Sequence, residues 1–139
     1  MTKLKTGKLV KEHLRMWPQR IFDRVDIIGK GKEKRLNELR KAGVYILYRD
    51  DEPYYVGQAK NMRGRIGSHA TDPTSRLFHF WNYFSAFVIE DSGMRSEVES
   101  ILITAMPTTN NANPKLPKIR TPNEVRDLLR EMRRTPSKS

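Results

Sequence analysis

Residues 42–70, AGVYILYRDDEPYYVGQAKNMRGRIGSHA, contain two short apolar and aromatic segments that are joined by an acidic turn. Side chains of a β-strand alternate between the two faces of a sheet. In the first segment, alternation predicts that Val44, Ile46 and Tyr48 lie on one face of the sheet and that Tyr45 and Leu47 lie on the other. In the second, it separates Tyr54 and Val56 from Tyr55. A hairpin can therefore bring Tyr45 and Tyr55 to one side of a small sheet.

The basic segment after the hairpin is predicted to form a helix. Asn61 is a suitable N-cap, and the helix is expected to run to about His69. Met62 and Ile66 lie one turn apart and are expected to contact the core. Arg65 and His69 are also four residues apart, so they share a different face and can point at one site.

A third strand and another helix are predicted further along the chain. Residues 84–90 alternate as a strand, with Phe87 and Ile89 on one face. The aromatic side chains of this region are interpreted mainly as core, although aromatic and basic residues together can also stack on nucleobases. Residues 95–106 have the apolar spacing of a helix, formed by Val98, Ile101, Leu102 and Ala105.

Helices are also predicted on both sides of this region. Before it, two apolar stripes separated by Pro18 indicate helices, formed by Val10, Leu14 and Trp17 and then by Ile21, Phe22, Val25 and Ile28. A short helix is expected at 32–41. A last helix is expected from Pro122, with its inward side chains Val125, Leu128, Leu129 and Met132. We therefore expect a basic helical extension at 1–41, a core at 42–114, and a basic C-terminal helix with a frayed tail at 115–139.

The net charge of +11 is concentrated in the two flanking segments. Residues 1–42 have 13 basic and 5 acidic side chains, a net of +8. Residues 115–139 have 8 basic and 3 acidic side chains, a net of +5, whereas residues 43–114 have a net of −2. Basic arms around a near-neutral centre are the arrangement expected for a protein that binds a polyanion such as nucleic acid.

Composition excludes several other classes. No run of 18 apolar residues is present, so no membrane span is expected. The basic N-terminus has no continuous apolar segment and is interpreted as mature protein, not as a signal peptide. The absence of cysteine excludes disulfides and thiolate metal sites and fits a cytoplasmic protein.

The central segment resembles the GIY-YIG endonuclease superfamily. Gly43-Val44-Tyr45 matches the first family motif and Tyr55-Val56-Gly57 the second. The residues that match later family positions follow in the expected order, as Arg65, His69, Glu99, Leu102-Ile103, Pro107 and Asn110. The resemblance covers about half of the chain. It implies a small α+β domain, with a three-stranded antiparallel sheet flanked by helices, that hydrolyses DNA phosphodiester bonds.

The resemblance also implies roles for these residues. Tyr45 is expected to act as general base or to orient the attacking water, and Tyr55 to orient water or phosphate. Arg65 is expected to stabilise the scissile phosphate, because its guanidinium matches two phosphate oxygens. His69 can bond a tyrosine hydroxyl or a phosphate. Glu99 is expected to hold one Mg²⁺ or Mn²⁺ ion per active site, since one carboxylate can suffice for an ion that keeps several waters.

Periodicity alone leaves the choice of metal ligand open. Glu97 and Glu99 lie about 100° to either side of Val98 on a helix, so both flank the apolar stripe equally. Only the Leu-Ile spacing of the family favours Glu99. Three histidines, His13, His69 and His79, do not form a zinc cluster by their spacing.

Further DNA contacts are expected from Lys60 and Arg63, and Asn110 is expected to support the site or contact DNA. Two alternatives remain: a non-catalytic binding module on the same scaffold, or a nuclease that acts on RNA or on branched DNA. No sequence-reading domain is recognised. Specificity is therefore expected to come from the flanking helices, from DNA shape, or from a homodimer or a protein partner.

Overall fold

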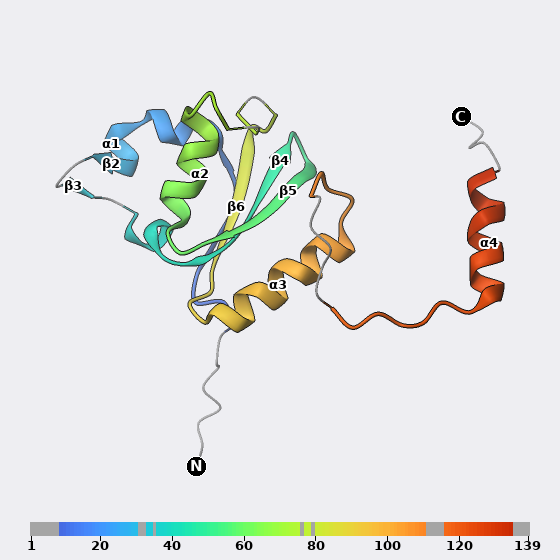
Figure 1. Cartoon of the computed structure of the whole chain (residues 1–139). Helices are drawn as coiled ribbons and strands as arrows, with labels where there is room; N and C mark the ends of the chain where they lie inside the picture. Colours follow the sequence, from blue (N-terminus) through green and yellow to red (C-terminus); the bar gives the residue numbers. More distant parts are fainter. Residues whose placement is uncertain are drawn as a thin grey trace, which may run out of the picture.

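The computed structural model describes residues 9–30, 33–34, 36–75, 77–78, 80–110 and 116–134. Four antiparallel strands form the main sheet in the order β1-β6-β4-β5 (Figure 1). Their bounds are His13–Pro18 for β1, Gly43–Arg49 for β4, Glu52–Ala59 for β5 and Tyr83–Val88 for β6. The α+β fold class is thus confirmed, and the sheet has one strand more than the three predicted.

β1 is the additional strand, and it lies where a helix was predicted. It pairs with β6, and its register shifts between Leu14 and Trp17, where Met16 has a φ of 55°. This bulge lets Leu14 and Trp17 pack against the same core cluster although they are three residues apart. The helix prediction for 10–17 is wrong because the bulge gives two strand residues the spacing of a helical stripe.

The rest of the N-terminal region forms short elements where longer helices were predicted. These are the 3-10 helices η1 (Gln19–Asp23) and η2 (Asn37–Arg40), the helix α1 (Val25–Ile28) and the paired strands β2 (Gly29–Lys30) and β3 (Glu33–Lys34). Ile21 and Ile28 of the second predicted stripe are buried, whereas Val25 is 50% exposed, so that stripe is only partly right. Lys32 and Arg35 of the helix predicted at 32–41 lie outside the described residues.

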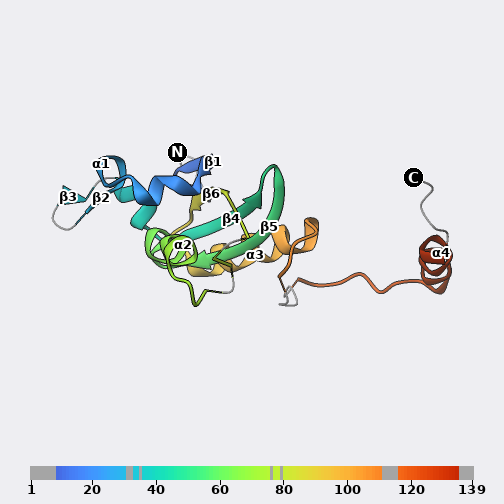
Figure 2. The ribbon, with the colours of Figure 1, turned by 90° about the horizontal axis from the view of Figure 1, so that it is seen from above.

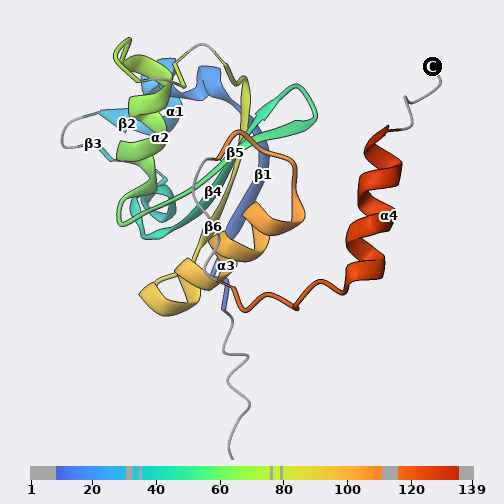
Figure 3. The ribbon, with the colours of Figure 1, turned by 45° about the vertical axis from the view of Figure 1, so that its right-hand side comes forward.

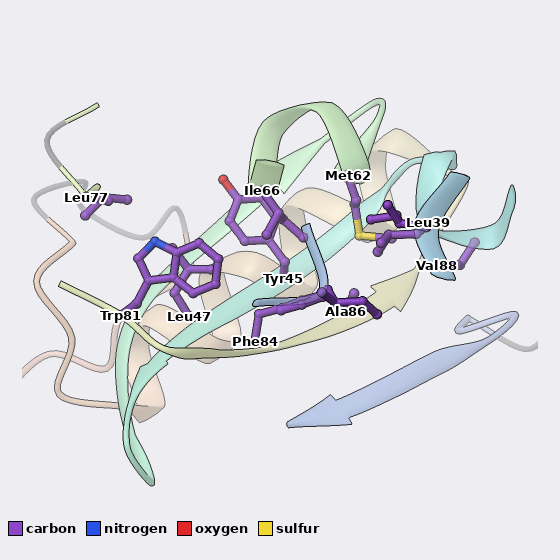
Figure 4. Close-up of a cluster of buried hydrophobic side chains, with 12 residues drawn as sticks. Leu39, Tyr45, Leu47, Met62, Ile66, Leu77, Trp81, Phe84, Ala86 and Val88 are labelled. Atoms are coloured by element: carbon purple, nitrogen blue, oxygen red, sulfur yellow. The ribbon is translucent and has the colours of Figure 1, made fainter. Parts of the chain in front are cut away.

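Apolar side chains fill both faces of the main sheet. On one face, Tyr45 and Leu47 of the sheet pack in a cluster with Met62 and Ile66 of the helix α2 (Met62–Thr71) (Figure 4). The other face packs against the helix α3 (Ser92–Ala105) and includes Val44, Ile46, Val56 and Ile89. The predicted alternation along β4 and the inward residues of α2 are confirmed. Asn61 caps α2, as predicted, because its side chain accepts a hydrogen bond from the backbone N–H of Gly64 at 3.2 Å.

Among the hairpin residues whose face was predicted, Tyr54 is the one that lies on the opposite face of the sheet. Leu47 pairs with Tyr55 and Tyr48 pairs with Pro53, so the register shifts at Tyr54. Tyr54 therefore packs against the cluster that contains Tyr45, and not with Val56. Alternation fails here because a bulge changes which face the next side chain occupies.

α3 turns a different face toward the sheet than its apolar spacing indicates. Val98 and Leu102 pack inward as predicted, together with Ile103 and Met106 beyond the predicted stripe. Ile101 is 48% exposed, so this part of the prediction is wrong. The buried face is centred near Leu102, and this rotation brings Glu99 toward β5.

The last helix, α4 (Asn123–Arg134), has no buried residue. It is separate from the sheet in three orientations (Figure 1, Figure 2, Figure 3). The residues predicted to face inward are exposed, which corrects that prediction: Val125, Leu128, Leu129 and Met132. The predicted frayed tail, 135–139, lies outside the described residues, and the boundaries 1–41, 42–114 and 115–139 stay predictions. No described helix is long and apolar enough to cross a membrane.

Replacement of Gly43 by alanine tests the packing between β4, β6 and α2. A Cβ atom at Gly43 would overlap the Phe87 carbonyl oxygen and lie 2.6 Å from Met62 Cε. We expect Gly43→Ala to lower the free energy of unfolding by about 2 kcal/mol, the usual scale of overpacking. Urea unfolding followed by circular dichroism measures this loss.

Gly64→Ala is the matched control, because its Cβ would lie no closer than 3.5 Å to any neighbouring atom. Alanine also favours a helix over glycine. An equal loss of stability in both variants would contradict the packing argument.

Candidate active site

Tyr45 of β4 and His69 of α2 form the centre of the candidate site. Tyr45 Oη lies 3.1 Å from His69 Nε2, and His69 Nδ1 lies 2.9 Å from Ser75 Oγ. With the imidazole proton on Nδ1, the phenol donates to Nε2 and Nδ1–H donates to Ser75. Ser75 therefore orients the ring so that Nε2 accepts the phenol proton.

Tyr55 lies beside this pair, as the hairpin prediction required. Its ring centroid is 6.4 Å from that of Tyr45 and 6.0 Å from that of His69. The register explains the approach, because Tyr45 pairs with Gly57 and Leu47 pairs with Tyr55. Tyr45 and Tyr55 are thus neighbours on one face of the sheet.

The Tyr45 side chain is buried over Gly57. A Cβ atom at Gly57 would overlap the hydroxyl and ring of Tyr45, so only glycine leaves room for the phenol there. Tyr45 is 1% exposed. Burial, and then the neighbouring Tyr55, raise the pKa of the Tyr45 phenol, while Arg65 lowers that pKa and Glu99 raises it. Charges on both Arg65 and Glu99 therefore act on the Tyr45 hydroxyl.

A partly buried network positions Glu99 on α3. Gln58 Nε2 donates to Glu99 Oε1 at 2.9 Å, and Gln58 Oε1 accepts from Arg95 Nε at 3.3 Å. Arg95 is 7% exposed and also donates to the carbonyl oxygens of Ile89 and Glu90. Gln58 therefore bridges an anchored arginine and the carboxylate, which restricts the orientation of Glu99.

The fold distinguishes the two glutamates that spacing alone left equivalent. Glu99 is half-buried and bonded to Gln58 of β5, whereas Glu97 is exposed. The reason is the rotation of α3, which turns the side of the helix with Glu99 toward β5. Glu99 as metal ligand stays a prediction, supported by its hydrogen bond to Gln58 and its electrostatic effect on Tyr45.

A cleft of about 600 Å³ opens between α2 and the start of α3, at Gln58 and Arg95 of the network that holds Glu99. Its lining includes Gln58, Lys60, Asn61, Arg65, Ser68 and Arg95. Arg65 and Lys60 are exposed, so both can meet a phosphate in the cleft. Arg63 lies differently, because its Nη2 donates to the Gly29 carbonyl oxygen at 2.9 Å. Contact of Lys60 or Arg63 with DNA stays a prediction.

Asn110 forms hydrogen bonds with the backbone of β5 on the free edge of the sheet. Its Oδ1 accepts from the Val56 backbone N–H at 2.9 Å, and its Nδ2 donates to the Val56 carbonyl oxygen at 2.7 Å. One side-chain amide thus pairs with the edge strand as a neighbouring peptide would. Asn110 therefore holds the backbone of the second motif at Val56, and its contact with DNA stays a prediction.

Sequence reasoning missed Gln58, Arg95 and Ser75. Two of them had a usable signal. Alternation along β5 places Gln58 on the face of Val56, toward the helix with Glu99. Arg95 precedes Glu99 by four residues and so shares its face of the helix. Ser75 follows the end of α2, and nothing in the sequence indicates its contact with His69.

The arrangement agrees with the comparison to protein families. The model of the GIY-YIG catalytic domain matches residues 41–112, which is more than half of the chain. The chain belongs to the GIY-YIG family. No curated protein and no solved structure matches it. The GIY-YIG family is one of nucleases, which agrees with the tyrosines, arginine and glutamate brought together here.

GIY-YIG nucleases generally depend on a divalent metal ion. Among the described residues, no group of three or more histidine, aspartate or glutamate side chains could hold an ion. A hard ion that keeps most of its waters needs only one carboxylate and substrate oxygens. Glu99, held by Gln58 beside the cleft, fits such an ion.

The raised pKa of Tyr45 predicts a pH dependence of stability. Folding favours the protonated phenol, so its contribution is complete below about pH 10, the ordinary tyrosine pKa, and is lost as the pH rises further. We expect the urea midpoint of wild type to fall more steeply above about pH 10 than that of Tyr45→Phe. Other groups titrate in both proteins, so their effect on stability cancels when the two urea midpoints are subtracted. Parallel curves would refute a raised pKa.

Replacement of Asn110 by alanine tests its role at the β5 edge. The change leaves two backbone groups of Val56 without their partners. We expect a loss of about 1–2 kcal/mol in the free energy of unfolding. Asn123→Ala, on the exposed helix α4, is the matched control and should be neutral. If both variants unfold at the wild-type urea concentration, Asn110 does not hold this edge.

Proposed function

We propose that this GIY-YIG protein is a metal-dependent DNA endonuclease that hydrolyses phosphodiester bonds at the cleft beside Tyr45. The observation that supports this most is the hydrogen bond between Tyr45 of β4 and His69 of α2, together with the electrostatic effects of Arg65 from α2 and Glu99 from α3 on the Tyr45 phenol. Phosphodiester hydrolysis needs a proton acceptor for water, a cation for the phosphate and a ligand for a metal ion.

Tyr45 and His69 supply the proton acceptor in this proposal. A phenol with a raised pKa is a weak source of tyrosinate, but Tyr45 Oη lies 3.1 Å from His69 Nε2. Tyr45 can accept the proton of the attacking water while it passes its own proton to His69, whose neutral imidazole is a suitable acceptor near pH 7. Ser75 then stabilises the imidazolium through Nδ1.

Arg65 and Glu99 act on the phosphate in this proposal. The exposed guanidinium of Arg65 lines the cleft and can bind two nonbridging oxygens of the scissile phosphate. Glu99 is placed to hold a Mg²⁺ or Mn²⁺ ion, which supplies charge neutralisation for the phosphate and leaving oxygen. Tyr55 lies where it can orient water or phosphate beside Tyr45.

The flanking charge supports nucleic acid as the substrate. Residues 1–42 and 115–139 have net charges of +8 and +5, and the catalytic region between them is near neutral. Basic flanks can hold a DNA backbone without placing excess cations in the catalytic region. A cytoplasmic location and a homodimer or protein partner stay predictions from the sequence.

Cleavage of supercoiled plasmid tests this function. Wild type should nick the plasmid with MgCl₂ and not with EDTA. Glu99→Gln should lower the rate at least about 100-fold, the scale for loss of one group that stabilises a transition state. Glu97→Gln is the matched control and should stay within about twofold of wild type, because Glu97 is exposed.

Two outcomes would overturn parts of the proposal. If wild type binds DNA and nicks no plasmid with Mg²⁺ or Mn²⁺, the protein is the non-catalytic binding module. If Glu97→Gln is inactive and Glu99→Gln is active, the ligand assignment is wrong.

A further inference from the structure

A stack of the half-buried Tyr54 ring, the exposed Phe80 ring and the exposed Arg49 lies outside the proposed catalytic group. The rings of Tyr54 and Phe80 are stacked with centroids 6.1 Å apart and an interplanar angle of 22°. The Arg49 guanidinium carbon lies 5.2 Å from the Tyr54 centroid and 5.7 Å from the Phe80 centroid. Phe80 is 45% exposed. The stack therefore presents an aromatic surface to solvent.

Hydrogen bonds hold the segment after Phe80 against the hairpin independently of the stack. The backbone N–H of Asp50 donates to Asn82 Oδ1 at 2.7 Å, and Asn82 Nδ2 donates to Asp50 Oδ1 at 3.0 Å. The Asn82 N–H also donates to the Tyr48 carbonyl oxygen at 2.9 Å. Trp81, next to Phe80, is buried in the core cluster. These interactions anchor Trp81 and Asn82, the two residues that follow Phe80, so its exposed ring is presented beside an anchored segment.

The Arg49 charge has no acidic partner within ion-pair distance in the described part of the chain. An arginine over aromatic rings offers a flat cationic surface that stacks on a nucleobase and can reach an adjoining phosphate. Aromatic rings accept any base, since each base has a π-face. The chemistry of the stack thus matches one nucleotide with an accessible base.

The stack is connected to the catalytic group on both of its sides. Tyr54 adjoins Tyr55, whose ring lies 6.0 Å from that of His69. Phe80 adjoins Trp81, whose Nε1 donates to the His69 carbonyl oxygen at 3.4 Å. The stack therefore lies one residue along the chain from two side chains that contact His69.

We propose that Arg49, Tyr54 and Phe80 form a platform on which an unpaired nucleobase of the DNA substrate stacks, next to the scissile phosphate. Bases inside a continuous duplex are stacked on one another and cannot reach such a surface without extrusion. The preferred substrate is thus DNA with unpaired nucleotides beside the cleavage point, such as a fork or a flap. This inference rests on the proposed endonuclease function for its link to cleavage, and on the stack itself for binding.

The test uses a DNA fork with 2-aminopurine at successive unpaired positions next to the junction, bound by the full-length protein in EDTA. Stacking on an aromatic ring quenches 2-aminopurine fluorescence. Wild type should quench at least one position and should bind the fork about tenfold more tightly than the matched duplex, the scale expected for one stacked base. Phe80→Ala should lose the quench and most of this preference.

Two further variants keep the test independent of folding. Phe80→Leu keeps apolar bulk but has no ring, so it should also lose the quench while its circular dichroism matches wild type. Tyr83→Ala is the matched control, because Tyr83 is 37% exposed and follows the alternation of β6 on the face opposite Phe84. It should keep wild-type quench and preference.

The outcomes separate this inference from the proposed function. Quench and fork preference that persist in Phe80→Ala and Phe80→Leu would overturn the platform, even if wild type nicks plasmid. If Phe80→Ala and Phe80→Leu lose the quench and the fork preference while Tyr83→Ala keeps them, the result supports the platform. This holds even if wild type nicks no DNA, and then only the endonuclease proposal fails. With an active wild type, Phe80→Ala should slow cleavage of the fork about tenfold more than cleavage of the plasmid.

Discussion

The packing of the Tyr45 ring over Gly57 is the contact on which the rest of the site depends. It joins the first and second sequence motifs as a cross-strand pair, and it leaves no space for a side chain at Gly57. Burial there keeps the phenol protonated and directs its hydroxyl to His69. A buried hydroxyl with one defined partner has a restricted orientation, which a catalytic group requires.

The site is assembled at the β5 edge from elements on both faces of the sheet. Tyr45 and α2 lie on one face, whereas α3 with Glu99 covers the other. Gln58 of β5 donates a hydrogen bond to Glu99 of α3, so the edge strand connects the part of the site on the Tyr45 face with the part on α3. An edge strand has unpaired backbone groups, and Asn110 satisfies those of Val56. The same edge is therefore stable and open to a cleft.

Charge and aromatic surface are distributed differently around this edge. The excess of basic residues lies in the flanking segments, and the middle of the chain has a net charge of −2. Long-range attraction of a polyanion therefore comes from the flanks, while local discrimination falls to a few side chains near the cleft. The exposed helix α4 belongs to the basic C-terminal segment and contributes nothing to the core.

The sequence by itself determined the hairpin, the capped helix α2, the helix α3 and the order of the family motifs, because these follow from alternation, capping and short-range spacing. It could not reveal β1, where a bulge between Leu14 and Trp17 imitates helical spacing, or the exposure of the α4 stripe. Only the tertiary structure chose between Glu97 and Glu99 as the carboxylate that faces β5. Periodicity defines a helix face relative to the helix itself, and packing against the sheet decides how that helix is rotated.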